Sequence, residues 1–162
     1  KAFGMRVIGT RRLQKKIENK KTIDYLIPFS DLDFLLKESD YIVISCPLTP
    51  LTEGMIGKSE FNKMKTTSYL INIARGSIVD EKILIEMLKK KKIAGAALDV
   101  FHSEPLSKKS PLFRLKNVFL SPHISGNFPN YNKIVMNLFN NNFHRFENGK
   151  ALKNRVCKKR LY

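Results

Sequence analysis

Short apolar runs alternate with helical patterns along this 162-residue chain, and that alternation is the strongest constraint on its fold. The runs with the composition of buried strands are residues 5–9, 41–45, 69–73, 94–100 and 117–120. Helical spacing is clear at residues 31–38, after a cap at Ser59 and after a cap at Asp80. Strands separated by helices are typical of βαβ units, so the pattern predicts an α/β fold with a parallel sheet. The unbroken run at residues 41–45 predicts a strand covered on both faces.

The carboxyl-terminal part of the chain carries one longer helical pattern, at residues 131–147. Its apolar side chains are spaced for one face of a helix: Ile134, Val135, Leu138, Phe139, Phe143 and Phe146. Gly149 suits the end of that helix, because glycine readily adopts the left-handed conformation found there. The segment after Gly149 is polar and basic, as in a tail or a docking strand.

The net charge of +16 fits either a nucleic-acid binder or a lysine-rich solvated surface. The lysines fall in short runs at expected loops and helix ends, without aromatic residues between them. We therefore favour the solvated surface and expect no nucleic-acid partner. No apolar run approaches the roughly 20 residues of a membrane span, and no signal peptide is recognisable, so we expect no membrane partner.

The two cysteines, Cys46 and Cys157, form no disulfide framework and lack metal-ligand spacing with the three histidines. We therefore expect reduced thiols, a cytoplasmic setting and no metal site. Cys46 by itself is more typical of a small buried side chain than of a nucleophile.

Polar side chains follow the carboxyl ends of the expected strands. Arg75, Glu104 and His123 each follow a different strand, and Asp99 lies at the end of one. Because the carboxyl ends of parallel strands meet at one edge of a sheet, we expect Arg75, Glu104 and His123 to share one cleft. Taken singly, each has an ordinary alternative: a surface arginine, a solvated acid and a structural histidine, with Asp99 as the cap of its loop.

Together the arginine, the acid and the histidine could bind a substrate carboxylate and transfer a proton. A histidine can pass a proton to or from an oxygen near neutral pH, and a nearby carboxylate holds the imidazole and favours its cation. An arginine can grip a substrate carboxylate through two parallel hydrogen bonds. Hydride donation lies beyond protein side chains and would require a nicotinamide cofactor.

Four segments carry a resemblance to a known family. They are YIVISCPLTPLTEGMIG at residues 41–57, MKTTSYLINIARGSIVD at 64–80, ALDVFHSEP at 97–105 and SPHISG at 121–126. In this order they resemble signatures of the D-isomer-specific 2-hydroxyacid dehydrogenases, which include glyoxylate/hydroxypyruvate reductases. The resemblance extends from Lys1 to about Val156.

The resemblance implies an oxidoreductase that transfers hydride between NAD(P)H and a 2-oxoacid such as glyoxylate or hydroxypyruvate. It implies that Arg75 binds the oxoacid, that His123 transfers the proton and that Glu104 pairs with His123. Asp99 would bind the nicotinamide carboxamide. Further residues would line the cofactor: Cys46, Pro47, Thr52, Ala74 and Gly126. A homodimer is also implied by the family.

One family feature, the phosphate-binding G-x-G-x-x-G loop, does not occur in this sequence. The first residues resemble the end of the helix that follows this loop, and family members are considerably longer. We therefore expect an incomplete Rossmann-like, doubly wound sheet that lacks its first strand, in an amino-terminally truncated enzyme with little turnover of its own. Residues 1–130 would form the partial NAD(P)-binding domain. Residues 131–162 would be the helix and return segment that dock on the missing substrate domain.

Two further functional alternatives stay open at this point. An inactive truncated remnant would keep the motifs without the activity. An NAD(P)-dependent corepressor-like binding module would use the same fold without needing the arginine, acid and histidine, all of which are present here.

The residues after the first expected strand bear on the choice of cofactor. NAD-preferring enzymes place an acidic residue there to bond the ribose 2′-hydroxyl. Here Thr10 is followed by Arg11 and Arg12, and arginines suit the 2′-phosphate of NADP. We therefore expect NADP to be favoured over NAD.

Overall fold

A computed structural model describes residues 1–12 and 14–158 of the chain. Its contacts divide the chain into two units, Lys1–Pro122 and His123–Tyr162, and each is described by itself. None of the described helices is long and apolar enough to cross a membrane. The described residues also contain no group of three His, Cys, Asp or Glu side chains placed to hold a metal ion.

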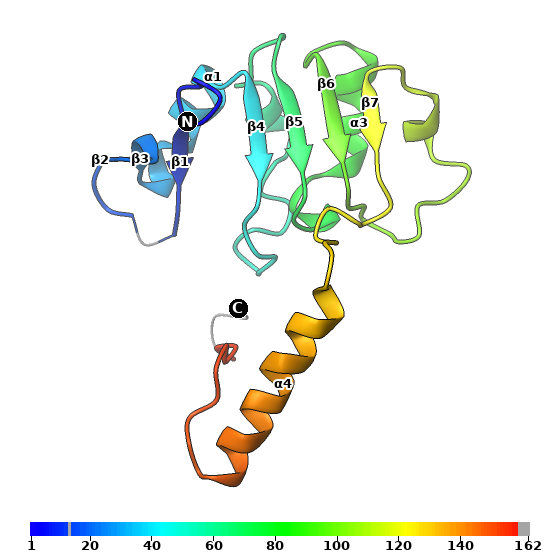
Figure 1. The fold of residues 1–162 in the computed structure, drawn as a ribbon. Coiled ribbons are helices and arrows are strands. Elements are labelled where there is room, and N and C mark those ends of the chain that lie inside the picture. The colour runs from blue at the N-terminus through cyan, green and yellow to red at the C-terminus, as the bar shows by residue number, and fades with distance from the viewer. Residues whose placement is uncertain (13, 159–162) are drawn as a thin grey trace. The chain divides into compact units, whose positions relative to one another are not determined.

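The first unit is built around a parallel sheet with the strand order β4-β5-β6-β7 (Figure 1). Its strands are β4 (Tyr41–Ile44), β5 (Tyr69–Asn72), β6 (Gly95–Leu98) and β7 (Val118–Leu120). Val43 lies opposite Ile71, and Ile71 lies opposite Ala97, so the strands are in register. The predicted α/β fold with a parallel sheet is confirmed, and the carboxyl ends of these strands meet at one edge.

A second sheet of three strands precedes the first along the chain, and the sequence analysis missed most of it. β1 (Ile8–Thr10) pairs in parallel with β3 (Ile23–Ile27), and β2 (Glu18–Lys20) pairs with β3 in the antiparallel direction. The strand expected at residues 5–9 therefore begins later. Asp24 interrupts the apolar run of β3, and its carboxylate accepts hydrogen bonds from the segment that leads into β1.

Helices cover one face of the four-stranded sheet and form the core with it. They are α1 (Leu32–Glu38), α2 (Lys58–Phe61) and α3 (Glu81–Lys89), with 3₁₀ turns η1 (Phe29–Asp31), η2 (Gly76–Ile78) and η3 (Pro111–Arg114). Ile42 and Leu70 of the sheet are buried in one cluster with Leu36, Phe61 and Leu84 of the three helices. The apolar stripe predicted for the helix after Asp80 therefore faces the core, as its spacing indicates.

The two expected helix caps have different outcomes. Asp80 caps α3 as predicted, because its carboxylate accepts the N–H of Ile83 at 3.1 Å. The cap expected at Ser59 is wrong: Gly57 precedes α2, and Ser59 lies inside the helix. Glu60 reaches back to accept the Gly57 N–H at 3.1 Å, which is the bond that the third helical residue contributes to a capping box.

The opposite face of the sheet is uncovered within the first unit, contrary to the expectation for residues 41–45. Burial alternates along β4, and the exposed side chains are large: Tyr41 is 59% exposed, Val43 54% and Phe119 of β7 69%. Tyr41 stacks on Tyr69 of β5 with ring centroids 5.9 Å apart. Exposed apolar surface of this kind marks a place where another element packs.

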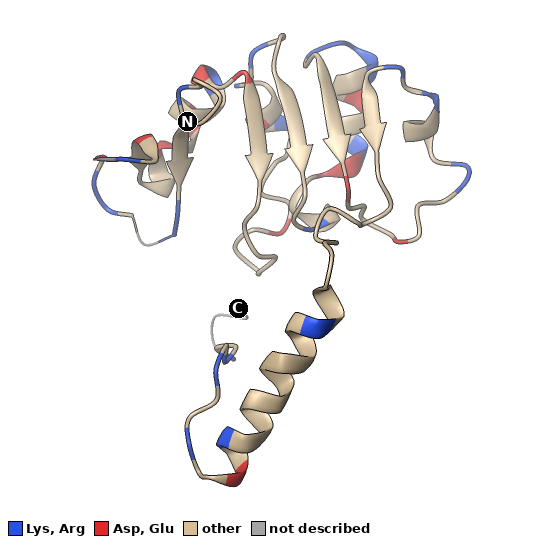
Figure 2. Ribbon diagram, viewed as in Figure 1, with Lys and Arg blue, Asp and Glu red and all other residues tan. Residues whose placement is uncertain are grey.

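Lysine and arginine residues lie mainly in loops and at helix ends of the first unit, as the sequence indicates (Figure 2). Several form exposed ion pairs, such as Lys63 with Asp33 at 2.6 Å and Lys90 with Glu86 at 2.6 Å. Exposed pairs of this type contribute little to stability, so the core and its hydrogen bonds hold the unit together.

The second unit contains α4 (Tyr131–Glu147), whose bounds agree with the predicted helix. Gly149 follows its end with φ of 63°, and the Gly149 N–H donates to the Phe146 carbonyl at 3.1 Å, as its expected role requires. None of the α4 residues is buried, although the apolar stripe predicts a packed face. The expected division into a nucleotide-binding domain at residues 1–130 and a docking segment at residues 131–162 stays a prediction.

Gly76, at the start of η2, marks the place where two loops of the first unit touch. A Cβ atom at this position would lie 1.9 Å from the carbonyl carbon of Phe101 and 2.4 Å from the backbone nitrogen of His102. Only a residue without a side chain lets the segment after β5 lie this close to the segment after β6.

We predict that Gly76→Ala destabilises the chain by about 1–3 kcal/mol or more, because the added methyl group meets backbone that cannot move aside easily. Urea unfolding of the chain measures this loss. The matched control is Gly57→Ala, where a Cβ would meet the Glu60 side chain at an ordinary 3.6 Å. Equal losses in the two variants would contradict the close contact.

Candidate active site

The turn after β5 holds Arg75, and its backbone is fixed by the side chain of Asn72. Asn72 Oδ1 accepts the Ala74 N–H at 3.0 Å, and Asn72 Nδ2 donates to the Arg75 carbonyl at 3.0 Å. Ala74 is buried, whereas Arg75 is exposed and donates from Nη1 to the Ala74 carbonyl at 2.6 Å. The turn thus presents a guanidinium group at the carboxyl edge of the sheet.

The loop after β6 holds Glu104, and it packs against the turn that carries Arg75. Glu104 Oε1 accepts the Phe101 N–H at 3.0 Å, which ties the exposed carboxylate to its own loop. The close approach of Gly76 to the Phe101 backbone joins this loop to the β5 turn. The segments that carry Arg75 and Glu104 therefore lie against each other, and the cleft expected for Arg75, Glu104 and His123 stays a prediction.

Asp99 is 3% exposed and links the ends of three neighbouring strands. Its N–H donates to the Asn72 carbonyl of β5 at 3.0 Å, and Ser121, which follows β7, donates from its hydroxyl to Asp99 Oδ1 at 2.5 Å. Ser121 was not singled out from the sequence, although a polar residue directly after an apolar strand is the signal that would have found it. The role of Asp99 toward a nicotinamide stays a prediction.

The loop after β4 is closed by Thr52. Its hydroxyl donates to the Pro47 carbonyl at 2.7 Å and accepts the Thr49 N–H at 2.8 Å. This hydroxyl therefore shapes the loop, and the expected lining of a cofactor site by Pro47 and Thr52 stays a prediction. Cys46 at its start is half-buried, and burial raises the pKa of the Cys46 thiol above its ordinary value.

The segment after β1 holds the residues expected to choose between NAD and NADP. The Thr10 hydroxyl is buried and has no hydrogen-bond partner among the residues that the structure describes. Arg11 Nε donates to Gln14 Oε1 at 3.2 Å, and Arg12 is exposed. A buried hydroxyl without a partner beside two cations fits the sugar and phosphate end of a nucleotide.

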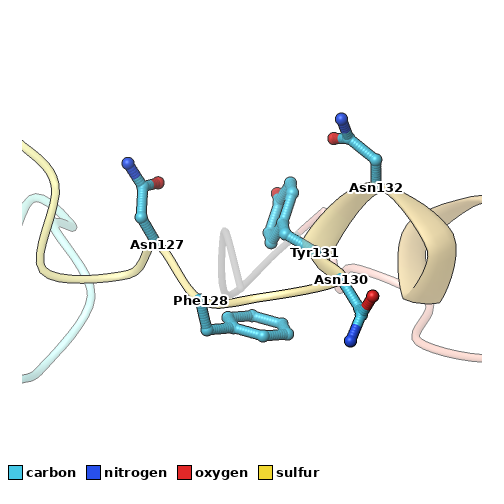
Figure 3. A pocket seen from close by; sticks show the side chains of 5 residues that line it. All are labelled: Asn127, Phe128, Asn130, Tyr131 and Asn132. Atoms are coloured by element: carbon cyan, nitrogen blue, oxygen red, sulfur yellow. The ribbon is translucent and has the colours of Figure 1, made fainter.

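His123 and Gly126 belong to the second unit, so their predicted meeting with the residues of the first unit stays a prediction. His123 has a positive φ of 55°, which is uncommon for a residue with a side chain. A hollow in the same unit is lined by Asn127, Phe128, Asn130, Tyr131 and Asn132 (Figure 3). Its asparagine side chains point in different directions, and it contains none of the expected site residues.

The chain is similar to a known enzyme family over most of its length. Residues 1–125 match the family described as D-isomer specific 2-hydroxyacid dehydrogenase, NAD binding domain. The chain is 42% identical over 151 residues to a glyoxylate reductase of Thermococcus gammatolerans, covering 93% of this chain and 44% of that protein. It is 46% identical over 123 residues to glyoxylate/hydroxypyruvate reductase B of Enterobacter agglomerans, covering 75% of this chain and 37% of that protein.

Solved structures give the same result. An NADPH-dependent glyoxylate/hydroxypyruvate reductase of Sinorhizobium meliloti, in complex with NADP and sulfate, superposes with a TM-score of 0.86 at 30% identity, over 99% of this chain and 51% of that one. A D-isomer specific 2-hydroxyacid dehydrogenase of Xanthobacter autotrophicus, in complex with NADPH and MES, gives 0.85 at 32% identity, over 98% and 64%. The chain thus spans about half the length of the proteins it matches.

We predict that Cys46 reacts slowly with iodoacetamide at pH 8, because its raised pKa leaves less thiolate than an ordinary cysteine has at that pH. Cys157 is exposed and serves as the internal control. Mass spectrometry of peptides after timed alkylation compares the two rates. If Cys46 is modified as fast as Cys157, the half-buried loop described for Cys46 is wrong.

Proposed function

The chain belongs to the D-isomer specific 2-hydroxyacid dehydrogenase family, and we propose that it forms the nucleotide-binding part of an enzyme that reduces a 2-oxoacid, such as glyoxylate or hydroxypyruvate, with NAD(P)H. The observation that carries the proposal is the packing of the Arg75 turn against the Glu104 loop at the carboxyl edge of the sheet. In open parallel sheets this edge is where ligands bind. The activity is proposed for the complete enzyme, of which this chain is a part.

Binding and proton transfer would be done by Arg75 and His123. The exposed guanidinium of Arg75 would hold the carboxylate of the oxoacid in a two-pronged contact. His123 would give its proton to the carbonyl oxygen during reduction and take a hydroxyl proton in the reverse direction. A bound nicotinamide would supply the hydride, which no side chain can provide.

Glu104 would act through His123. The Phe101 N–H donates to Glu104 Oε1 at 3.0 Å, which fixes the carboxylate on its own loop. A carboxylate next to an imidazole stabilises the imidazolium form, which is the proton donor that oxoacid reduction needs. Its pairing with His123 is therefore part of the proposal.

NADP is the cofactor that the residues after β1 favour. Arg11 and Arg12 offer two cations where NAD-preferring enzymes place an acid, and the buried Thr10 hydroxyl offers a hydrogen-bonding group beside them. Three of the similar solved structures contain NADPH or NADP. Toward the nicotinamide end, we propose that Asp99, Ala74, the loop from Cys46 to Thr52 and Gly126 line the cofactor.

The partner of this chain is the part of the enzyme that it does not span. The sheet face with Tyr41, Val43 and Phe119 is uncovered, and β1 and β4 are each the outermost strand of their sheet among the described residues. We propose that the missing half covers this face and supplies the parallel strand between β1 and β4. A homodimer, as in the family, and a cytoplasmic setting, as the reduced thiols indicate, complete the proposal.

The test joins this chain to the amino-terminal part of the Thermococcus gammatolerans reductase that it does not cover, which gives a complemented enzyme. We expect this enzyme to oxidise NADPH when glyoxylate or hydroxypyruvate is added. The parent reductase is the positive control, and Arg75→Ala in the complemented enzyme should abolish most of the activity. A folded complemented enzyme without activity would refute the proposed function.

For the cofactor, we predict that replacing both Arg11 and Arg12 with alanine raises KM for NADPH by roughly 10- to 100-fold in the complemented enzyme. A charge-assisted contact to phosphate is worth about 1.5–3 kcal/mol, and NADH lacks that phosphate. Steady-state kinetics with both cofactors measures the ratio of KM for NADPH to KM for NADH. The control removes two charges elsewhere, by Lys89→Ala with Lys90→Ala at the end of α3, and should leave it unchanged. An unchanged ratio in the arginine variant refutes the preference.

For the proton transfer, we predict a shift in the pH profile of oxoacid reduction. The rate falls as pH rises, and in Glu104→Gln this fall should occur at lower pH than in the unmodified complemented enzyme. The amide keeps the shape and can still accept the Phe101 N–H, but it no longer favours the imidazolium form of His123. The measurement is kcat/KM against pH.

The control for this change is Glu81→Gln. Glu81 Oε2 accepts the His102 N–H at 3.1 Å, so it bonds the same loop in the same way. Its profile should match that of the unmodified enzyme. If Glu104→Gln also leaves the profile in place, Glu104 does not pair with His123.

A further inference from the structure

Asn72 is the last residue of β5, and its side-chain amide is engaged at both ends although the residue is only 1% exposed. Its Oδ1 accepts from the Ala74 N–H and its Nδ2 donates to the Arg75 carbonyl, each at 3.0 Å. A buried amide costs free energy unless it is hydrogen-bonded, so its presence at the end of an apolar strand calls for a reason.

The reason lies in what these two bonds control. Ala74 is held at its N–H by Asn72, and its carbonyl accepts Arg75 Nη1 at 2.6 Å. The next carbonyl, that of Arg75 itself, is turned back onto the Asn72 amide. One side chain thus bonds the backbone on both sides of the Arg75 Cα, at the Ala74 N–H and at the Arg75 carbonyl.

Asn72 is itself anchored to the neighbouring strand. Its carbonyl accepts the Asp99 N–H at 3.0 Å, which ties it to the end of β6. The Asn72 amide thus connects the end of the sheet to the turn that carries Arg75, whose long side chain is exposed and flexible.

A second side-chain amide, that of the half-buried Asn117, shows what a purely structural role looks like. Asn117 precedes β7 at the opposite edge of the sheet, and its Nδ2 donates to the carbonyls of Leu88 and Ala94 at 3.3 and 3.2 Å. These bonds join the end of α3 to the start of β6, at the amino ends of the strands, whereas the residues of the candidate site follow the carboxyl ends. Asn72 differs because both of its side-chain bonds end on Ala74 and Arg75.

We propose that Asn72 is a positioning residue: it sets the direction of the Arg75 guanidinium toward the carboxylate of the oxoacid substrate. This inference rests on the proposed function, because it takes Arg75 as the substrate-binding group. A misplacement of about 1 Å in a group that orients substrate can reduce the rate by roughly 100-fold, so the effect is measurable.

The kinetic test uses the complemented enzyme with Asn72→Ala, which removes both side-chain bonds, and with Asn72→Asp, which keeps the volume but replaces the donor to the Arg75 carbonyl with an acceptor and adds a buried negative charge. We expect kcat/KM for glyoxylate to fall by roughly 10- to 100-fold in Asn72→Ala and by at least about 10-fold in Asn72→Asp. Asn117→Ala, the matched control, should lower the unfolding midpoint without lowering kcat/KM.

The decisive comparison repeats Asn72→Ala and Asn72→Asp in an Arg75→Ala background. Because Asn72 acts through Arg75, each should then change kcat/KM by less than about 3-fold. If an Asn72 variant lowers kcat/KM as much in the Arg75→Ala background as it does alone, the inference is overturned and Asn72 is a structural residue. If Arg75→Ala alone leaves the activity unchanged, it is the proposed function that fails.

A measurement on this chain itself needs no turnover. Amide hydrogen exchange by NMR should show the Ala74 N–H exchanging at least about 10-fold faster in Asn72→Ala, while the β5 amides stay protected. Asn117→Ala should leave the Ala74 N–H unchanged. An Ala74 amide that exchanges equally in all three proteins would show that Asn72 does not hold the turn, whatever the activity of the enzyme.

Discussion

The close contact of Gly76 with the Phe101 backbone is the constraint on which the candidate site depends. It leaves no room for a side chain, so the turn after β5 and the loop after β6 have one way to lie against each other. Hydrogen bonds from Asp99 to the end of β5, and from Ser121 to Asp99, extend the connection across the edge. The exposed Arg75 and Glu104, to which we assign roles in the reaction only as a proposal, are thus attached to a fixed backbone, which is what precise orientation of a substrate requires.

The carboxyl edge of the sheet is held together by these contacts, whereas one face of the same sheet is uncovered. Ile42 and Ile44 of β4 are buried in the core, whereas Tyr41 and Val43 between them are exposed. A strand with apolar residues on both faces is typical of a sheet that is covered on both sides. The sequence of β4 thus fits a larger protein than the first unit alone, in agreement with relatives about half of whose length this chain spans.

Features set by local pattern were predictable from the sequence, and features set by single contacts were not. The parallel sheet, the Asp80 cap and the bounds of α4 follow from periodicity and capping chemistry, and the structure confirms them. β3 was missed because Asp24 breaks its apolar run, and only the folded chain shows what bonds that carboxylate.

The segments of Arg75 and Glu104 were expected to meet because parallel strands end at one edge. The role of Asn72 depends on where its two amide atoms point, which no pattern records. The place of His123 beside Glu104 stays a prediction.

Transfer of deuterium from reduced cofactor to product tests the central claim most directly. The complemented enzyme would be incubated with glyoxylate and NADPH that carries deuterium at the transferable position, and the glycolate analysed by mass spectrometry. We expect glycolate with one deuterium on carbon, formed in step with cofactor oxidation, and a loss of roughly 10²–10⁴-fold in its rate with His123→Ala. Unlabelled product, or an equal rate with His123→Ala, would contradict hydride transfer at this site.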